Sequence, residues 1–170
     1  MKRFIGISIL FLFAGLTIQA QTFKFGHINS DELIQALPAY DTATKQLEKF
    51  RQDLINALEL MTVDFNNKNA AYEKDSKNLN EIVRQTKEQE LIDLNRRITE
   101  FQQNAQQQLQ DKQVELFQPI YTKVDNAIKA VGKENGFLYV FDVAKGSLLY
   151  FDETKSTNVL TLAKAKLGVK

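Results

Sequence analysis

The chain has 170 residues, with 22 basic and 21 acidic side chains, two prolines, one histidine and no cysteine. Without cysteine this chain can form neither a disulfide nor a thiolate metal site, and it cannot be a lipid-anchored lipoprotein. The near balance of charge gives no support to nucleic acid as a main partner.

Residues 1–20 are predicted to be a secretory signal peptide. Lys2 and Arg3 precede an uncharged run that ends at Ile18, and the small residue Ala20 follows. A basic head, a short apolar segment and a small terminal residue are typical of an exported precursor. About 15 apolar residues are fewer than the roughly 20 that span a bilayer, so cleavage near Ala20 is favoured over an uncleaved membrane anchor. The remaining length indicates one domain in an exported protein.

The first structured segment is predicted to be a strand followed by a short helix. "FKFGHIN", from Phe23 to Asn29, places its first two phenylalanines on one face, as a strand does. "SDELIQAL", from Ser30 to Leu37, follows with Ser30 as the expected helix cap. Pro38 then fits the first turn of a second helix, where its missing N–H is no loss.

Residues 42–118 are polar and contain neither glycine nor proline. Their apolar residues recur at steps of three, four or seven, which indicates a narrow helical stripe. The stripe comprises Leu47, Leu54, Leu58, Met61, Phe65 and Tyr72, and then Leu91, Leu94, Ile98, Phe101, Ala105 and Leu109. Between these halves the stripe is lost, and Asn78 or Asn80 can cap a new helix.

This span therefore predicts two long antiparallel helices joined near residues 75–80. Each helix would be about 50 Å long or more at 1.5 Å per residue. One narrow apolar seam is too thin to form a globular core, so we expect the helical hairpin to project as an arm from a separate body.

Pro119 lies within the helical pattern of the returning chain. A proline there removes a backbone hydrogen bond and bends the helix. Counted from an arm tip near Asn78, Pro38 and Pro119 lie at nearly equal distances, so both are predicted to mark a hinge between arm and body. The alternative is a tolerated kink without such a junction.

The end of the chain returns to mixed helix and strand. The helix after Pro119 should end near Gly136, which can adopt a left-handed cap. "FLYVFDV", Phe137–Val143, and "LLYF", Leu148–Phe151, are expected to form a β-hairpin. A last helix is expected over Asn158–Leu167, capped by Asn158 and stopped at Gly168.

Residues 21–41 and 119–170 would thus form a small α+β body. Its strand Phe137–Val143 is apolar on both faces, and a body of this size can bury little core alone. Covering the second face with further copies of the chain is the expected solution. The candidate residues for this contact are Phe137, Tyr139, Val140 and Phe141.

The order of these segments resembles one family along nearly the whole mature chain. The stretches that resemble it are "FGHINSDELIQALPAYDTA", the return "ELFQPIYTKVDNAIKAVGKENGFLYVFDV" and the ending "LLYFDE…NVLTLAKAKLG". They resemble the Skp (OmpH) family of periplasmic chaperones.

The resemblance implies a homotrimer whose bodies form a small β-barrel and whose arms surround a cavity. It also implies an ATP-independent holdase that keeps unfolded outer-membrane β-barrel proteins from aggregating during their transit to the outer membrane. One departure concerns charge, because residues 42–118 contain 11 basic and 13 acidic side chains, whereas familiar members have cationic arms. Lipopolysaccharide binding, attributed to some members, is therefore doubtful here.

Holding an unfolded client is best achieved by many weak contacts rather than one tight site. Candidate contact residues on the arm are Met61, Phe65, Tyr72, Leu79, Ile82 and Phe101. The alternative for each is a place in the seam between the two helices.

The sequence contains no pattern that predicts catalysis, a metal or a cofactor. The lone His27 is expected to pack or lie at the surface, and Asp142 and Asp152 to be edge or turn residues. No phosphate-binding loop, nucleophile elbow or zinc helix occurs, so an enzyme is not expected. The competing function is an envelope spacer or scaffold whose arms bind one fixed partner.

Overall fold

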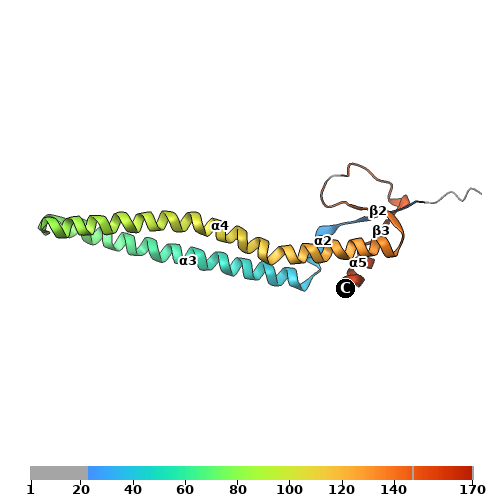
Figure 1. Cartoon of the computed structure of the whole chain (residues 1–170), viewed down its shortest axis with the longest axis horizontal. Helices are drawn as coiled ribbons and strands as arrows, with labels where there is room; N and C mark the ends of the chain where they lie inside the picture. The colour runs from blue at the N-terminus through green and yellow to red at the C-terminus, as the bar shows by residue number, and fades with distance from the viewer. Residues whose placement is uncertain (1–22, 147, 170) are drawn as a thin grey trace, which may run out of the picture.

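The computed structural model describes residues 23–146 and 148–169, and it consists of a small body from which a long two-helix arm projects (Figure 1). This is the α+β fold with a helical arm that the sequence predicts. The expected signal peptide, residues 1–20, and its cleavage site near Ala20 lie outside the described residues.

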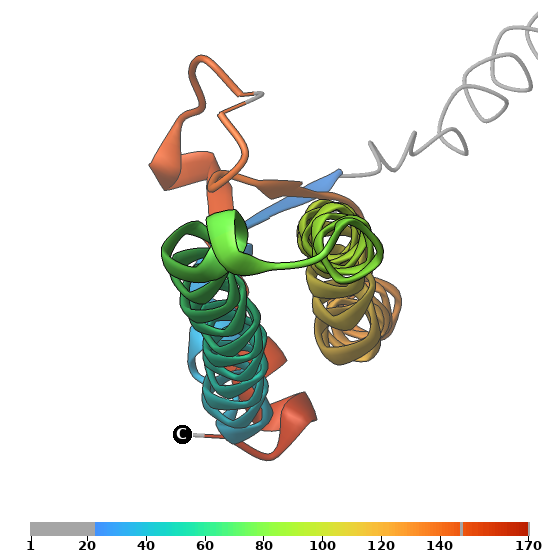
Figure 2. The same ribbon diagram turned by 90° about the vertical axis from the view of Figure 1, so that its left-hand side faces the viewer.

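The helices differ greatly in length. In chain order the helices and 3₁₀ turns are α2 (Ser30–Gln35), α3 (Pro38–Asp75), the turn η1 (Ser76–Asn78), α4 (Glu81–Glu134), the turn η2 (Glu153–Lys155) and α5 (Leu160–Leu167). At 1.5 Å per residue, the 38 residues of α3 and the 54 of α4 extend over about 57 and 81 Å. Figure 2 looks along the arm and shows these two helices side by side.

The body contains a three-stranded sheet in the order β2-β1-β3. The strands are β1 (Lys24–Ile28), β2 (Phe137–Asp142) and β3 (Ser156–Asn158), and both neighbours run parallel to β1. The expected hairpin is therefore wrong: residues 148–151 form no strand, and β2 pairs with β1 instead. Parallel pairing needs a long crossover, which α2, α3 and α4 supply, and it allows α4 to cover one face of the sheet.

The caps of the helices follow from local sequence, with one exception. Of the two predicted caps of α4, Asn78 and Asn80, it is Asn80 that precedes the helix, and its Oδ1 accepts the backbone N–H of Val83 at 2.9 Å. The predicted cap of α2, Ser30, is wrong because Asn29 caps this helix, its Oδ1 accepting the N–H of Glu32 at 3.1 Å. The Ser30 hydroxyl instead contacts Asp142, at the end of β2.

The proline and glycine predictions at helix ends are confirmed. Pro38 lies in the first turn of α3, and Gly136 follows α4 with a φ of 67°. Gly168 ends α5 with a φ of 72°. Asn158 lies in β3 rather than in the helix, but its Oδ1 accepts the N–H of Leu160 at 2.9 Å and so still caps the first turn.

The core lies between the sheet and the helices of the body. Its buried members are Ile28, Leu33, Ile34, Leu37, Ala43, Phe117, Ile120, Val124, Val131, Val159 and Ala163. Gly26 allows β1 to approach Val159 closely, because a Cβ at position 26 would lie 3.1 Å from Cγ1 of Val159. Ala43 and Phe117 belong to the base of the arm, so the core continues a short way beyond the body.

Pro38 and Pro119 lie at the same level of the molecule. The ring of Tyr40 packs edge-on against that of Phe117, with centroids 5.5 Å apart, and each ring lies two residues from one of the prolines. Pro119 lies inside α4 without ending it. Figure 1 shows α4 changing direction where its colour passes from yellow to orange. Whether this level acts as a hinge stays a prediction.

Candidate interaction surfaces of arm and body

The seam of the arm is only partly shielded from water. Met61, Phe65, Tyr72 and Phe101, four of the predicted client contacts, are half-buried. Across the residues of the arm between Ala43 and Phe117, Leu94 alone is buried. These four side chains therefore belong to the seam, yet each keeps part of its surface available for a weak contact.

A shallow apolar groove opens between the two helices near the middle of the arm. It has a volume of about 250 Å³ and is lined mainly by Leu54, Ile55 and Leu58 of α3 and by Phe101, Ala105 and Leu109 of α4. Arg51, which interrupts the stripe, borders this groove and pairs with Glu48 at 2.9 Å. The groove provides an apolar surface that is open to solvent without being a closed pocket.

The most exposed large apolar residues of the arm lie off the predicted stripe, and one of them, Ile55, also borders the groove. They are Ile55, Leu60, Val63, Ile82, Val83, Ile92 and Val114. Ile82 is 78 % exposed and was among the predicted contacts, whereas Leu60, at 71 %, was not. The periodic stripe selects residues that face the partner helix, so it overlooks these. The opposite pattern identifies these residues, because an apolar residue that lies outside the stripe must face water.

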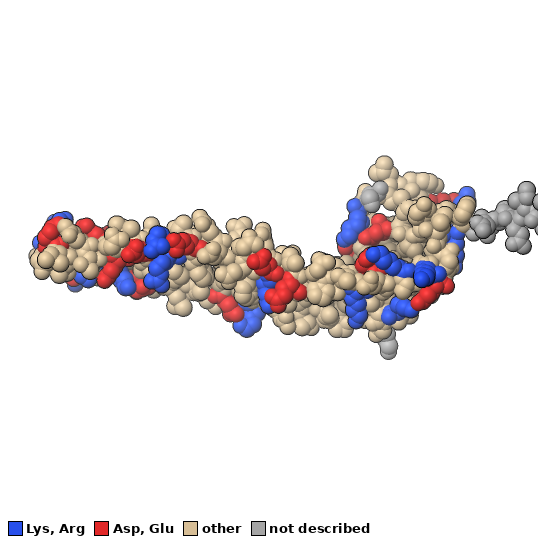
Figure 3. All heavy atoms as spheres, in the orientation of Figure 1, with Lys and Arg blue, Asp and Glu red and all other residues tan. Residues whose placement is uncertain are grey.

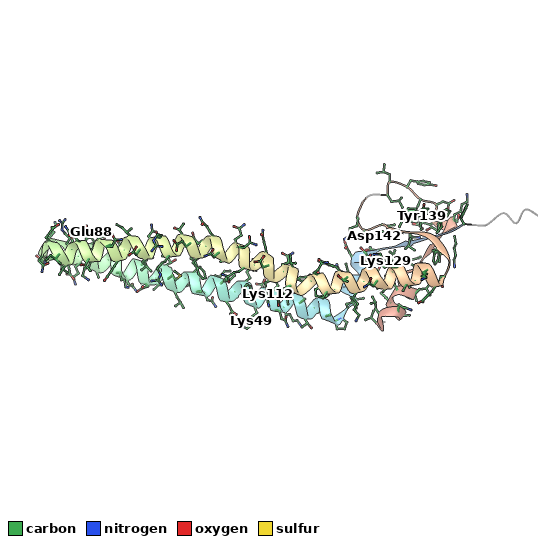
Figure 4. All side chains as sticks on the ribbon, in the orientation of Figure 1. Lys49, Glu88, Lys112, Lys129, Tyr139 and Asp142 are labelled. Atoms are coloured by element: carbon green, nitrogen blue, oxygen red, sulfur yellow. The ribbon has the colours of Figure 1, made fainter. Side chains whose placement is uncertain are left out.

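The tip of the arm is held by polar contacts. The Tyr72 hydroxyl of α3 donates a hydrogen bond to the Glu88 carboxylate of α4, and Arg84 pairs with Glu81. The bond to Glu88 is the main reason that the pKa of Tyr72 is raised above its usual value. Figure 4 shows Glu88 close to the tip. The Tyr72–Glu88 bond joins the two helices near the η1 turn, whereas the Arg84–Glu81 pair lies within α4. Leu79, another predicted contact, is half-buried within the same tip.

The charges of the arm are arranged as pairs within each helix. Lys49–Asp53, Lys68–Asp64 and Arg96–Glu100 are spaced four residues apart, with N–O distances of 2.7, 3.4 and 2.8 Å. Figure 3 shows acidic and basic side chains interspersed along this face of the arm, with uncharged stretches between them. Exposed pairs of this kind contribute at most about 0.5 kcal/mol each. They leave no strong field of one sign on the arm face shown.

The body presents an open aromatic face on the side of the sheet away from the core. The rings of Phe25 and Tyr139 stack with centroids 6.4 Å apart, and those of Tyr139 and Phe141 with centroids 5.8 Å apart. Figure 4 shows Tyr139 at this outer side of the body. Tyr139 is 57 % exposed, and among the described residues no second layer covers it on this face of the sheet.

The four predicted residues for contacts between copies do not share one environment. Tyr139 and Phe141 lie on the open face, whereas Phe137 and Val140 are partly buried and pack against the core. Val140 lies under α4, with its Cγ2 3.6 Å from the position of a Cβ on Gly132. The strand is thus covered on one side by its own chain and open on the other.

His27 also lies on the open face. Its Nδ1 is 2.9 Å from the Ser156 hydroxyl, and its ring lies 4.7 Å from that of Phe151. This is the packing role expected for a lone strand histidine. Within the described residues, no group of three or more histidine, aspartate or glutamate side chains is arranged to hold a metal ion.

Asp142 has a role that its place at a strand end did not indicate. Its carboxylate accepts the backbone N–H of Ser30 at 3.1 Å, the Ser30 hydroxyl at 2.5 Å and the N–H of Ala144 at 3.1 Å. Burial alone would raise the pKa of Asp142, but these hydrogen bonds outweigh it and hold the pKa below its usual value. Asp142 therefore fastens the end of β2 to the start of α2. Asp152 is the expected turn residue, accepting the N–H of Thr154 at 3.0 Å.

A larger cavity lies where α2 and α4 meet the end of β2. It has a volume of about 650 Å³ and is lined by Ile34, Tyr121, Val124 and Ile128, with Asp31 and Lys145 among its charged residues. Lys145 and Asp31 pair at 2.8 Å.

Among the described helices, none is both long enough and apolar enough to cross a lipid bilayer.

The family model for OmpH-like outer membrane proteins matches residues 24–167. A chaperone protein Skp from Yersinia enterocolitica is 23% identical over 166 residues, which cover 98% of this chain and 100% of that protein. A chaperone protein Skp from Photorhabdus laumondii is 24% identical over 141 residues, covering 83% of this chain and 86% of that protein. Because the family model spans both the arm and the body, the chain belongs to the OmpH-like family.

Proposed function

We propose that the protein is an ATP-independent holdase chaperone of the periplasm. In this proposal three copies assemble through their bodies, and their arms surround a cavity that holds unfolded outer-membrane β-barrel proteins until they reach the outer membrane. Membership of the OmpH-like family and the likeness to two proteins named chaperone protein Skp support it.

The observation that carries the proposal is the solvent exposure of the apolar side chains along the arm. A long arm with a half-solvated seam, an open groove and separately exposed residues such as Leu60 and Ile92 offers many weak contacts. Unfolded β-barrel proteins expose strands that lack partners and therefore aggregate. Weak contacts at high local concentration can keep such chains apart and release them without fuel.

The open aromatic face supports assembly. One face of the sheet is covered by α4, whereas the other exposes Tyr139 and Phe141. The sheet therefore has a packing layer on one side only. Large exposed apolar patches of this kind mark protein contacts. Neither the assembly of the trimer nor the holding of a client requires lipopolysaccharide. The paired charges of the arm do not favour lipopolysaccharide binding.

The test is the refolding of an outer-membrane β-barrel protein by dilution from urea, followed by light scattering. The wild-type protein should suppress aggregation at a fixed ratio of trimer to client. Replacing Leu60, Ile82 and Ile92 together with serine should weaken this protection, because it removes three exposed contacts while sparing the seam. The matched control replaces the exposed polar residues Gln89, Gln103 and Gln108 with serine and should protect as the wild type does.

The same assay separates the two candidate functions. Protection by the wild type that is reduced in the apolar triple variant, but not in its control, supports the holdase. An intact trimer that leaves client aggregation unchanged would contradict the holdase and favour an envelope spacer whose arms bind one fixed partner.

A further inference from the structure

One asparagine of the chain is followed by glycine, and this pair, Asn135–Gly136, forms the turn from α4 into β2. Figure 1 shows the chain reversing there, at the end of the body far from the arm. In an Asn-Gly sequence the backbone nitrogen of glycine can attack the side-chain amide carbon of asparagine, because no Cβ on the glycine hinders the approach. The turn therefore contains the groups for a spontaneous modification, the deamidation of Asn135.

The surroundings of the turn leave room for this reaction. Gly136 is exposed and Asn135 is half-buried, so water reaches the turn. A Cβ placed on Gly136 would lie more than 4 Å from every described atom beyond its chain neighbours. The reaction intermediate would consequently meet no steric obstacle on the glycine side.

The folded turn nevertheless holds the reacting atoms out of position. Asn135 has a ψ of 4°, so its own backbone nitrogen eclipses that of Gly136, whereas ring closure needs the Cβ of Asn135 in that place. The side-chain amide is also tied down, because its Nδ2 donates a hydrogen bond to the carbonyl of Val131 at 2.9 Å. The N–H of Gly136 donates to the carbonyl of Lys133 at 3.4 Å. Reaction therefore requires that the turn first opens locally.

The products of deamidation would not fit the closed turn. The Val131 carbonyl accepts two hydrogen bonds from Asn135, from the backbone N–H at 3.1 Å and from Nδ2 at 2.9 Å. A carboxylate cannot donate the second bond, and its negative charge opposes the dipole at the C-terminal end of α4. The isoaspartyl product also adds one methylene to the backbone just before Phe137, which pairs with Lys24 at the start of β2.

We propose that Asn135–Gly136 is a deamidation site that reacts when the end of α4 opens and that then keeps this end of the body loosened. The nitrogen of Gly136 forms a bond to Cγ of Asn135, and the bond from Cγ to Nδ2 breaks. Nδ2 leaves as ammonia and takes up the proton that the Gly136 nitrogen loses. Water then adds to either carbonyl of the resulting succinimide ring, breaks its bond to the ring nitrogen and gives aspartate or isoaspartate.

Peptide mapping by mass spectrometry after incubation at pH 8 tests the site. In guanidinium chloride, where the chain is unfolded, Asn135 should deamidate faster than every other asparagine. In the folded protein its rate should be lower by about tenfold or more, and a factor of ten corresponds to about 1.4 kcal/mol for opening the turn. Asn29, followed by Ser30, is the internal control. Slower reaction at Asn135 than at Asn29 in the denaturant, or equal rates at Asn135 with and without it, would overturn the proposal.

Thermal unfolding measures what the modification does to the body. Asn135→Asp carries the charge of the product on a normal backbone and should lower the unfolding temperature. The isoaspartate fraction of aged wild-type protein, separated by chromatography, should unfold at a lower temperature still. Asn135→Ser is the matched control, because serine has no amide to lose, and its unfolding temperature should not change during the incubation. An isoaspartate fraction as stable as the unreacted protein would contradict the loosening. Client protection enters neither test, so the outcome is independent of the proposed function.

Discussion

The body and the arm bury their apolar residues to different depths. In the body, Leu33 and Val159 are fully buried among helices and strands far apart in the sequence. In the arm, one helix faces one other helix, and most seam residues keep contact with water. The body therefore depends on tertiary packing, whereas the arm depends on helix propensity and local pairs. A partly solvated seam leaves apolar surface free for a client, which a closed core cannot do.

Removing most of the arm should have the largest effect on function and the smallest on the fold of the body. The deletion should span residues 52–105 with a short glycine-serine link, because Ala43 and Phe117 at the arm base belong to the core. We expect the shortened chain to fold and assemble but to lose protection of clients. Thermal unfolding and the light-scattering assay measure the two properties. Full protection by the armless chain would show that the arm is not the binding surface.

Replacing one leucine by alanine in the body and one in the arm should lower the free energy of unfolding by different amounts. Leu33→Ala removes a fully buried side chain and should lower the free energy of unfolding by about 3 kcal/mol. Leu58→Ala, in the half-buried seam, should cost about 1 kcal/mol, because water already reaches that site. Urea unfolding of the two variants checks this ratio, and equal losses would contradict the difference in burial.

Asp142 should make the stability of the body depend on pH. Its folded pKa is lowered, so its contribution is fully present above the unfolded pKa of about 3.9 and is lost as pH falls through the folded value. Asp142→Asn should lower the free energy of unfolding by about 1 kcal/mol at pH 7, since neutral hydrogen bonds replace charged ones. In urea unfolding this difference should shrink at pH 3. A difference that is the same at both pH values would exclude the carboxylate as its source.

Pro119→Ala should have the smallest effect on stability. The alanine restores a backbone hydrogen bond to the carbonyl of Glu115, so the free energy of unfolding should stay constant or rise by less than about 1 kcal/mol. If Pro119 is a hinge, X-ray scattering should show a changed radius of gyration with the trimer intact, and protection should weaken most for large clients. An unchanged scattering profile and client range would leave Pro119 as a tolerated kink.

The predictions that succeeded depend on signals within a few residues. The absence of glycine and proline and the apolar period predicted the arm, and Asn80, Pro38 and Gly136 marked helix ends correctly. The seam residues were found by the same period. The exposed residues, such as Leu60, were overlooked because the period selects what faces the other helix.

The pairing of the strands was decided only by the tertiary structure. The sequence indicates that Phe137–Val143 and Leu148–Phe151 favour strands, but not which strand lies beside each. A hairpin was expected because the two segments are close in sequence, yet β2 lies beside β1, more than 100 residues away. In that arrangement α4 covers one face of β2, and Asp142 binds Ser30. Helix periods and caps are local properties, whereas strand partners depend on which distant surfaces bury the most apolar area together.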